Sequence, residues 1–274
     1  MPLPNGEEKI LTLIGHGYIG SAIARELDAQ GEKYRWDYHT SVSRPSGAVI
    51  INAAGYVGEP NVDACEKNKE ACIDGNILWP LQLERFAEYR PIVHVTSGCV
   101  YTGTMLEGGI GIAYSEEDEP NFDFTNGSFY SGCKAMFERH FRATNRDHYL
   151  LRVRLPFGPT PHPKNLLTKL AGYPRLIDQR QSISSVEDVA KVAVWFAQEL
   201  PPPGIYNCVN PQAITIRRIA EIMGWTKQWM DIAEFRSIIR TPRSECELTT
   251  DKLQAVFPLR SSAEALEACR EGFT

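Results

Sequence analysis

The sequence has 274 residues, of which 43% are hydrophobic and 23% charged, and its net charge is −5 at neutral pH. This length accommodates one large domain with a smaller lobe, and the mild negative charge argues against a nucleic-acid-binding surface. Residues 1–9 are polar and no apolar run reaches the roughly 18 residues of a membrane span, so neither a signal peptide nor a membrane partner is expected.

The seven cysteines are expected to be free thiols. Their number is odd and no CxxC pair occurs, whereas a disulfide framework or a zinc site needs paired or closely spaced cysteines. Free thiols are typical of a reducing compartment, so the sequence predicts a cytoplasmic protein without a metal site.

Strands and helices are predicted to alternate through the first part of the chain. Short apolar or β-branched runs predict strands over residues 9–14, 34–38, 48–52, 91–96 and 149–155. Helical spacing of apolar residues predicts helices over residues 18–30, 62–89 and 129–145. Such alternation is typical of an α/β fold, in which helices cover both faces of a parallel sheet.

Prolines change the character of the chain from residue 156 onward. They break it into loops and short pieces at positions 156, 159, 161, 163 and 174. Further on, helices are predicted over residues 186–200 and 214–223, a strand over 205–209, and short elements after 239. We expect a main domain over residues 1–160 and a smaller C-terminal lobe over residues 161–274, with segments at about 183–210 returning to the main domain.

Residues 15–20 read Gly-His-Gly-Tyr-Ile-Gly, a complete GxGxxG between the first predicted strand and the first predicted helix. Glycines permit a tight turn and a close approach of the backbone to a pyrophosphate, which the helix N-terminus also attracts. The motif predicts a Rossmann-like doubly wound parallel sheet that binds a dinucleotide; the alternative is a glycine-rich turn without a ligand. The cofactor candidates are Gly15, Gly17, Tyr18, Ile19 and Gly20.

The end of the second strand bears on the choice between NADH and NADPH. Asp37 lies where an acid would accept a hydrogen bond from a ribose 2′-hydroxyl, which favours NADH. His39, Thr40 and Arg44 follow closely and could instead hold a 2′-phosphate. A third interpretation is that Asp37 is a solvated strand end, and all three stay open at this point.

Tyr130 and Lys134 form a YxxxK pair on one face of a predicted helix. The lysine ammonium is expected to lower the phenol pKa from about 10, and the tyrosine would then give a proton to a carbonyl oxygen as hydride reaches the carbon. Ser97 follows a predicted strand and could share the hydrogen bond to that carbonyl; a helix cap or turn is the alternative.

Cys99 lies two residues beyond Ser97, in a turn that would face the same pocket. A thiol there could exchange protons with a carbon next to a ketone. The alternative is a small buried hydrophobic residue, which is the usual position of a free cysteine.

Several segments together resemble the extended short-chain dehydrogenase/reductases. Within that family the chain resembles the dTDP-4-dehydrorhamnose reductases and, more closely, the bifunctional nucleotide-rhamnose synthases, which are UDP-4-keto-6-deoxyglucose 3,5-epimerase/4-reductases. The segments that carry the resemblance are residues 15–20, 52–63 (NAAGYVGEPNVD), 76, 96–99, 109–112, 116–122, 127–131, 134–136, 152–156 (RVRLP), 165–169 (NLLTK) and 242–244.

The resemblance implies a bifunctional 3,5-epimerase/4-keto-reductase. Such an enzyme converts a UDP- or dTDP-linked 4-keto-6-deoxyglucose to nucleotide-L-rhamnose with NADPH, or with NADH as the alternative, and is compatible with a homodimer. Two other functions stay open: a 4-reductase without epimerase activity and a non-catalytic, cofactor-binding regulatory subunit. The intact Ser97, Tyr130 and Lys134 argue against the regulatory subunit.

The resemblance also assigns individual residues. It implies that Cys99 and Lys169 are the opposed acid/base groups of epimerisation, which requires a lowered pKa for Lys169. It places Asn165 and Arg243 at the sugar or diphosphate, in a substrate-binding lobe, and adds Val62 and Gly98 to the substrate contacts. The further cofactor contacts that it implies are Asn52, Ala53, Ala54, Tyr56, Asn76, Lys134 and Pro156.

The sequence departs from the family in two places. The stretch between the second strand and residue 48 is short, so a helix and a strand of the usual fold are expected to be missing. Glu59 stands where the plant proteins have arginine. The short stretch bears on the adenosine end of the cofactor site, and hence on the choice between NADH and NADPH.

Overall fold

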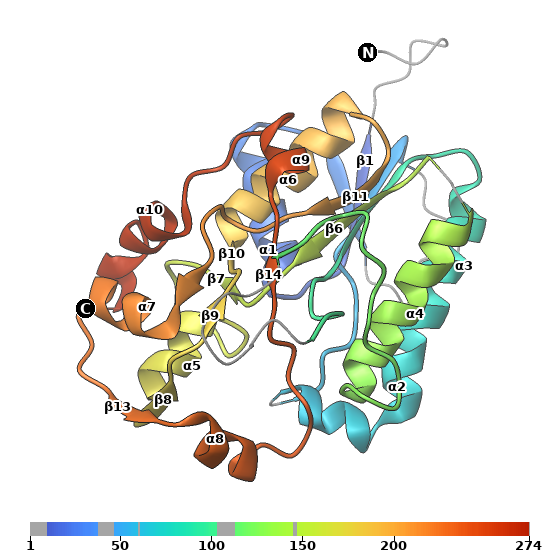
Figure 1. The fold of residues 1–274 in the computed structure, drawn as a ribbon. Helices are drawn as coiled ribbons and strands as arrows, with labels where there is room; N and C mark the ends of the chain where they lie inside the picture. Colours follow the sequence, from blue (N-terminus) through green and yellow to red (C-terminus); the bar gives the residue numbers. More distant parts are fainter. Residues whose placement is uncertain (1–9, 38–46, 60, 103–112, 145–146, 274) are drawn as a thin grey trace.

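The computed structural model describes residues 10–37, 47–59, 61–102, 113–144 and 147–273. Six parallel strands form its central sheet, which confirms the predicted Rossmann-like α/β fold (Figure 1). In spatial order the strands are β11 (Gly204–Asn207), β6 (Tyr149–Val153), β4 (Ile92–Ser97), β3 (Val49–Asn52), β1 (Leu11–Ile14) and β2 (Tyr34–Asp37). Segment 109–112 and residues His39, Thr40 and Arg44 lie outside the described residues.

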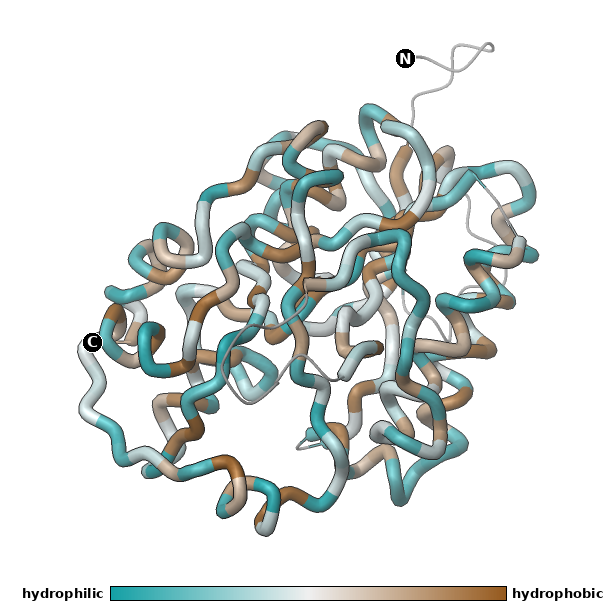
Figure 2. The backbone as a smooth tube through the Cα atoms, in the orientation of Figure 1, coloured by the Kyte–Doolittle hydropathy of each residue, from teal (hydrophilic) through white to brown (hydrophobic). Residues whose placement is uncertain are grey.

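Alternate side chains of the strands pack on opposite faces of the sheet, as the pleat of a β-strand requires. Leu13 and Ile51 pack on one face, which α1 (Tyr18–Ala29) and α6 (Val186–Glu199) cover. On the opposite face, Ile14, Ile50 and Ile92 pack against α3 (Trp79–Ala87). Leu150 and Ile205 pack against α4 (Phe129–Thr144). Hydrophilic and hydrophobic residues alternate along these helices, as expected when one side of each helix lies on the sheet (Figure 2).

The direction of chain winding reverses at β1. Strand β1 pairs with β2 on one side and with β3 on the other, and β2 is the edge strand of the described sheet. No further strand of the described ranges joins β2, and residues 38–46, on which the expected loss of a helix and a strand depends, lie outside those ranges. In open α/β sheets, ligands bind in the crevice at such a reversal, beyond the carboxyl ends of the strands.

The region predicted as one helix over residues 62–89 is divided into four pieces. They are a 3-10 turn η1 (Val62–Glu66), α2 (Lys69–Ile73), a π-helical turn η2 (Asp74–Leu78) and α3. The side chain of Asn61 accepts from the Asp63 N–H, and that of Asn68 accepts from the Ala71 N–H. Each asparagine therefore caps a new helical start, which a search for apolar periodicity does not detect.

A second hydrophobic core holds the C-terminal lobe together. Its buried residues come mainly from α5 (Leu166–Gly172), α7 (Ile216–Ile222) and α10 (Ser262–Glu267). The predicted helix over 214–223 starts later than expected because Thr215 ends strand β12 (Ile214–Thr215) and caps α7 by accepting from the Arg218 N–H. The other elements are β5 (Ala113–Tyr114), β7 (Pro156–Phe157), β8 (Arg175–Ile177), β9 (Arg180–Gln181), β10 (Ser184–Ser185), β13 (Gln228–Met230), α8 (Ile232–Ile238), β14 (Glu247–Leu248), α9 (Asp251–Gln254) and η3 (Arg270–Phe273).

The seven cysteines are free thiols, as predicted, and only Cys99 is partly exposed. The described part of the chain contains no group of three or more His, Cys, Asp or Glu side chains placed to bind a metal ion. Among the same residues, no helix is both long and apolar enough to cross a membrane.

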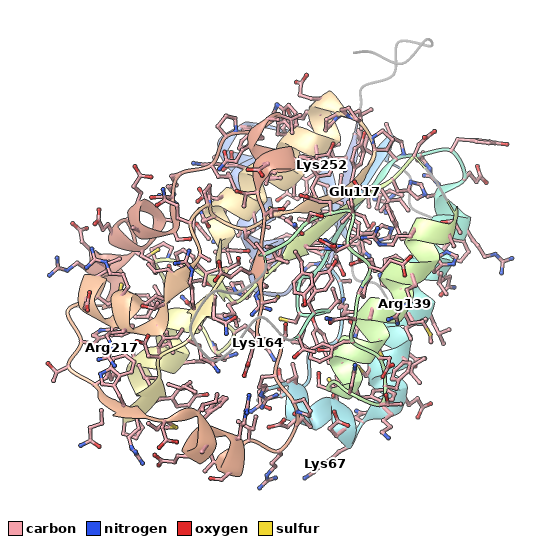
Figure 3. The ribbon with its side chains drawn as sticks, in the orientation of Figure 1. Lys67, Glu117, Arg139, Lys164, Arg217 and Lys252 are labelled. Atoms are coloured by element: carbon pink, nitrogen blue, oxygen red, sulfur yellow. The ribbon has the colours of Figure 1, made fainter. Side chains whose placement is uncertain are left out.

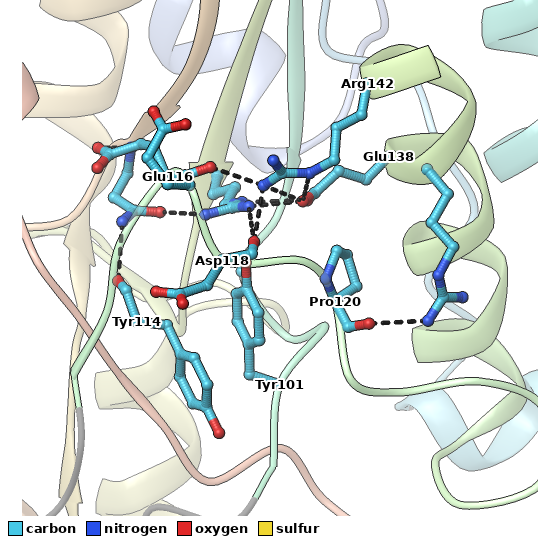
Figure 4. A network of polar contacts seen from close by, with 12 residues as sticks. Tyr101, Tyr114, Glu116, Asp118, Pro120, Glu138 and Arg142 are labelled. Carbon is cyan, nitrogen blue, oxygen red and sulfur yellow. Dashed lines mark hydrogen bonds and ion pairs between the residues drawn. The ribbon is translucent and has the colours of Figure 1, made fainter.

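A buried ion pair joins α4 to β6. The guanidinium of Arg152 donates from Nε to the Glu138 carboxylate at 3.0 Å, and both side chains are at most 1% exposed. Arg142 reaches the same carboxylate at 3.2 Å, and its guanidinium also donates to the backbone oxygens of Glu116 and Asp118 (Figure 4). The network therefore ties the loop before α4 to the centre of the sheet.

Replacing Glu138 by glutamine should destabilise the fold strongly. The substitution leaves the buried charge of Arg152 without a carboxylate, and breaking a buried pair in this way costs about 3–5 kcal/mol. Urea denaturation measures the change. The matched control is Glu234→Gln, which removes the exposed pair between Arg175 and Glu234 and should cost less than about 1 kcal/mol. Equal losses in the two variants would contradict this prediction.

Candidate active site

The glycine turn after β1 is shaped by close backbone contacts. Gly15 has φ +108°, and a Cβ added there would lie 2.6 Å from the backbone nitrogen of Ala54. A Cβ at Gly20 would lie 2.1 Å from the carbonyl oxygen of Gly15. At Gly17, by contrast, an added Cβ would meet no atom within 4 Å. The first and third glycines of the motif are thus needed by the fold, whereas the second faces open space.

The N-terminus of α1 fits an anion. Gly17 is its N-cap residue and provides no side-chain cap, and the first turn contains no acidic residue. The first N–H groups of a helix have no partner within it and carry partial positive charge, so they can bind a phosphate in the space beside Gly17. The predicted cofactor residues Gly15, Gly17 and Gly20 therefore fit a dinucleotide pyrophosphate.

The end of β2 is held against the glycine turn. The Asp37 carbonyl accepts from the Gly15 N–H at 3.1 Å, and the indole of Trp36 donates to the Gly15 carbonyl at 3.0 Å. The same indole stacks on His16 with ring centroids 4.3 Å apart. The Asp37 carboxylate lies 3.7 Å from Arg35, so it has a protein partner as well as the position expected of a ribose ligand.

Two asparagines shape the turn after β3. Asn52 is buried, lies against His94 and accepts from the Trp79 indole at 3.1 Å. Asn76 is also buried, and its amide accepts from the Tyr56 N–H at 3.2 Å and donates to the Tyr56 carbonyl at 2.7 Å. Both side chains therefore have protein partners, and they set the path of residues 52–56 beside the glycine turn.

Lys134 reaches this turn from α4. A Cβ added at Gly55 would lie 3.2 Å from Lys134 Nζ, and the same ammonium lies 5.8 Å from the centre of the Tyr130 ring. Burial lowers the pKa of Lys134 to about 8, partly offset by the thiols of Cys72 and Cys133. The YxxxK pair thus places a cation near both the turn after β3 and the phenol of Tyr130.

The predicted lowering of the Tyr130 pKa is wrong. Burial raises the pKa of the phenol, and the nearby Cys99 thiol raises it further, while a hydrogen bond with Ser97 lowers it by less. Tyr130 is 8% exposed, so the cost of placing a phenolate away from water exceeds the help from its neighbours. The structure therefore provides a tyrosine that stays protonated and can act as an acid.

A cavity of about 510 Å³ lies between the sheet and the lobe. Tyr130 and Cys99 line it from the main domain, and Lys169 and Arg243 line it from the lobe. The pKa of Lys169 is lowered by burial and then by the charges of Lys164 and Arg243, as its proposed role requires. Three predicted catalytic residues, Tyr130, Cys99 and Lys169, thus face one space.

Lys164 is a cavity residue that the sequence analysis missed. Its Nζ donates to the carbonyl of Gly58, so it connects the lobe to the loop after β3. Figure 3 shows Lys164 near the middle of the molecule, whereas the labelled Lys67 and Arg217 lie near the edge of the view. The sequence feature that could have identified Lys164 is its position in the proline-rich segment, one residue before the predicted substrate residue Asn165.

Arg243, which lines the cavity, is paired with an acidic residue. Its guanidinium lies 2.9 Å from the Asp63 carboxylate and also donates to the Thr241 hydroxyl at 3.2 Å. Burial would raise the pKa of Asp63, but the Thr241 hydrogen bond and the Arg243 charge outweigh it and lower that pKa. Val62 lies beside this pair and also lines the cavity.

Other predicted residues lie outside the cavity lining. Asn165 is fully buried, caps α5 by accepting from the Leu167 N–H, and donates to the carbonyls of Gly158 and Thr160. Tyr18 stacks on His162, with centroids 4.5 Å apart. These contacts connect the lobe to the glycine turn and to the start of α5.

The remaining predicted residues have packing or backbone tasks. Ile19 and Ala53 pack against the core beneath α1 and α6. Gly98 lies against Arg154, where an added Cβ would be 3.1 Å from its Cγ. Ala54 N donates to Asn52 at 3.3 Å. Pro156 belongs to β7, which pairs with β10.

Comparisons with known proteins agree with this geometry. A family model described as the RmlD substrate binding domain matches residues 8–223. A bifunctional dTDP-4-dehydrorhamnose 3,5-epimerase/dTDP-4-dehydrorhamnose reductase of Arabidopsis thaliana is 32% identical over 91% of this chain and 88% of its own length.

Solved structures share the fold. The UDP-rhamnose synthase of Acanthamoeba polyphaga mimivirus superposes with a TM-score of 0.87 at 21% identity, covering 97% of this chain and 100% of that one. A dTDP-4-dehydrorhamnose reductase of Bacillus anthracis, solved in complex with NADP, gives a TM-score of 0.76 at 14% identity over 97% and 99% of the two chains.

Replacing Gly17 by alanine tests the anion site. Because an added Cβ meets no atom, the thermal stability should stay near that of the unchanged protein. The methyl group would occupy the space beside the helix N-terminus, so NADPH should bind at least about tenfold more weakly in a fluorescence titration. Gly15→Ala is the contrasting variant, because its Cβ clashes with Ala54 and should lower stability as well. Unchanged NADPH affinity in Gly17→Ala would exclude this site.

Proposed function

The chain belongs to the RmlD substrate-binding-domain family, and on that premise we propose that it reduces a nucleotide-linked 4-keto-6-deoxy sugar and also epimerises it at C3 and C5. The product would be a nucleotide-linked L-rhamnose. The observation that most directly supports the proposal is the composition of the cavity. Tyr130, the proposed proton donor of the reduction, shares it with Cys99 and Lys169, which lie on separate parts of the fold.

The reduction follows from the phenol and its neighbours. A bound nicotinamide dinucleotide supplies the hydride. Tyr130 stays protonated because burial raises its pKa, so it can give its proton to the C4 oxygen. Lys134, whose ammonium lies 5.8 Å from the ring, stabilises the negative charge that develops on the phenol. Ser97 supplies a second hydrogen bond to the same oxygen.

Epimerisation uses the same oxygen site. A 4-ketone acidifies the hydrogens on C3 and C5, and removal of either leaves an enolate with its charge on the C4 oxygen. Tyr130 and Ser97 can stabilise that charge. Inversion requires a proton to leave from one face and another to arrive on the opposite face, so two opposed groups are needed. We assign them to Cys99 and Lys169, and the lowered pKa of Lys169 makes it easier for that ammonium to give up a proton.

The cationic side of the cavity suits a nucleotide diphosphate. Lys164, Lys169 and Arg243 line it within a protein whose net charge is −5, so the attraction for an anion is local. Tyr173, Phe235 and other apolar side chains line the cavity and can cover a base. Among the relatives, UDP- and dTDP-linked chemistry both occur by name, so the proposed substrate carries one of these two nucleotides.

NADPH is the proposed cofactor. Support comes from the glycine turn, which fits a pyrophosphate, and from the Bacillus anthracis reductase, which was solved with NADP. Asp37, the residue that favours NADH, is paired with Arg35, so its carboxylate is already partly neutralised.

Supplying the unepimerised 4-keto sugar and NADPH to the purified chain tests the proposal directly. Formation of nucleotide-L-rhamnose would establish both steps in one chain, whereas reduction of only the pre-epimerised sugar would show a reductase without epimerase activity.

Tyr130→Phe should slow reduction by about 10²–10⁴-fold, because it removes the proton donor. Cys99→Ala should abolish entry of solvent deuterium at C3 and C5, with Cys208→Ala, a buried thiol, as the matched control. Normal exchange in Cys99→Ala would exclude the cysteine from the mechanism.

The rate of reduction should fall as the pH rises through about 8. The Lys134 ammonium is present below that pH and lost above it, since burial lowers its pKa to about 8, while the raised pKa of Tyr130 keeps the phenol protonated. A pH profile of kcat/KM on the pre-epimerised substrate should therefore decline about tenfold per pH unit on its alkaline side. Lys134→Arg, which keeps its charge, should move that decline to higher pH. An alkaline limb at the same pH in both proteins would assign it to another group.

A further inference from the structure

Arg154 is a fully buried cation directly beneath the catalytic turn. It follows β6, and its side chain runs against Gly98, the residue between Ser97 and Cys99. Leu155, the next residue, has φ +40°, an uncommon conformation for a leucine. The strained backbone and the close contact with Gly98 both constrain where the guanidinium lies.

The hydrogen-bond partners of this guanidinium are neutral. Its Nη1 donates to the Ser244 hydroxyl at 2.7 Å, and its Nη2 donates to the Gln181 amide oxygen and to the Ser244 carbonyl. Its Nε is buried and has no hydrogen-bond partner in the described structure. The remaining contact is with Cys99, whose Sγ lies 3.7 Å from Nη1.

Arg152, two residues earlier and within β6, is a buried arginine that does have a counter-ion. It is equally buried, but it donates to the Glu138 carboxylate at 3.0 Å. Within the described ranges, Arg154 forms no ion pair with an acidic side chain. A buried charge without a counter-ion is costly, so a fold that keeps one there indicates that an anion forms beside it.

We propose that Arg154 is a positioning residue that stabilises the thiolate form of Cys99. The nearest group that can become an anion is the Cys99 thiol, and a guanidinium at hydrogen-bond distance favours its deprotonated form. This inference rests on the proposed role of Cys99 in proton exchange, but it describes a property of the protein that exists before any substrate binds.

The proton balance of epimerisation gives this charge a use. When the Cys99 thiolate takes a proton from a substrate carbon, the C–H electron pair moves toward the C4 oxygen and sulfur becomes neutral. When the thiol returns a proton to carbon, the electron pair of the S–H bond stays on sulfur. Arg154 therefore carries the counter-charge of the sulfur whenever Cys99 is a thiolate, which is before a proton is taken from carbon and after one is returned to it.

The other groups that face Cys99 do not replace Arg154. The nearby Tyr130 and Cys246 stay neutral near pH 7 because burial raises the pKa of each. Lys164, Lys169 and Arg243 are cationic side chains elsewhere in the cavity lining, where substrate would bind, and Lys169 is itself the proposed partner in proton exchange. Arg154, by contrast, places its guanidinium 3.7 Å from the Cys99 sulfur.

The rate of alkylation by iodoacetamide, measured from pH 5 to pH 10, tests the proposal without substrate. Cys99 is the partly exposed cysteine and the other six are buried, so mass spectrometry of the labelled peptide reports on it, with Cys99→Ala as the background. In Arg154→Gln the midpoint of the pH dependence should move up by at least about one unit, and labelling at pH 7 should fall about tenfold. Arg154→Lys keeps the charge and should stay closer to the unchanged protein.

Ser244→Ala is the matched control. It removes a neutral partner of Arg154 but keeps the guanidinium, so its alkylation midpoint should move by less than about half a unit. If Arg154→Gln does not fold, Arg154→Met, an apolar side chain of similar length, replaces it. An unchanged midpoint in a folded, charge-free Arg154 variant overturns the proposal. A second outcome separates the two proposals. If the midpoint shifts in Arg154→Gln but the unchanged protein does not exchange solvent deuterium at C3 and C5, the effect of Arg154 on Cys99 is supported and the proposed epimerisation is excluded.

Discussion

The site depends on one constraint: the carboxyl ends of parallel strands meet at the same edge of a sheet. Gly15 follows β1, residues 53–56 follow β3, the Ser97–Cys99 turn ends β4, and Arg154 follows β6. These segments are far apart in the sequence, but the parallel pairing of their strands places them around one crevice. The glycine turn and the reactive turn are therefore neighbours because of strand pairing alone.

Burial is the second physical influence on the site, and it acts differently on each group. Burial favours the neutral form of each group, so it raises the pKa of Tyr130 and lowers the pKa values of Lys134 and Lys169. The result is a phenol that keeps its proton and lysines that release theirs more easily. The cavity thus has a proton donor in Tyr130 and, in Lys169, an ammonium that loses its proton more easily than it would in water.

Two buried arginines, Arg152 on β6 and Arg154 just after it, have different neighbours. Arg152 has a carboxylate partner in Glu138 and connects the sheet to α4. Arg154 has neutral partners and the Cys99 thiol, so within the described residues no carboxylate balances its charge. Two arginines only two positions apart in the sequence thus differ in their proposed roles because their neighbours differ.

The sequence by itself determined the features that local patterns encode. The GxGxxG turn, the YxxxK pair and the alternation of strands and helices depend on residues close in the chain. These patterns predicted the fold class, and the six-stranded parallel sheet confirms it. It also identified Cys99 and Lys169 through a family resemblance, and both line the cavity.

Only the tertiary structure decided the environment of those residues. The pKa of Tyr130 rises where the sequence predicted a fall, and Asn165 is used as a helix cap. Lys164 lines the cavity although no motif indicated it, and the RVRLP segment did not indicate that Arg154 contacts Cys99. Desolvation and charge pairing depend on which segments pack together in space. A pattern within a few residues cannot report that a guanidinium at 154 lies beside a thiol at 99.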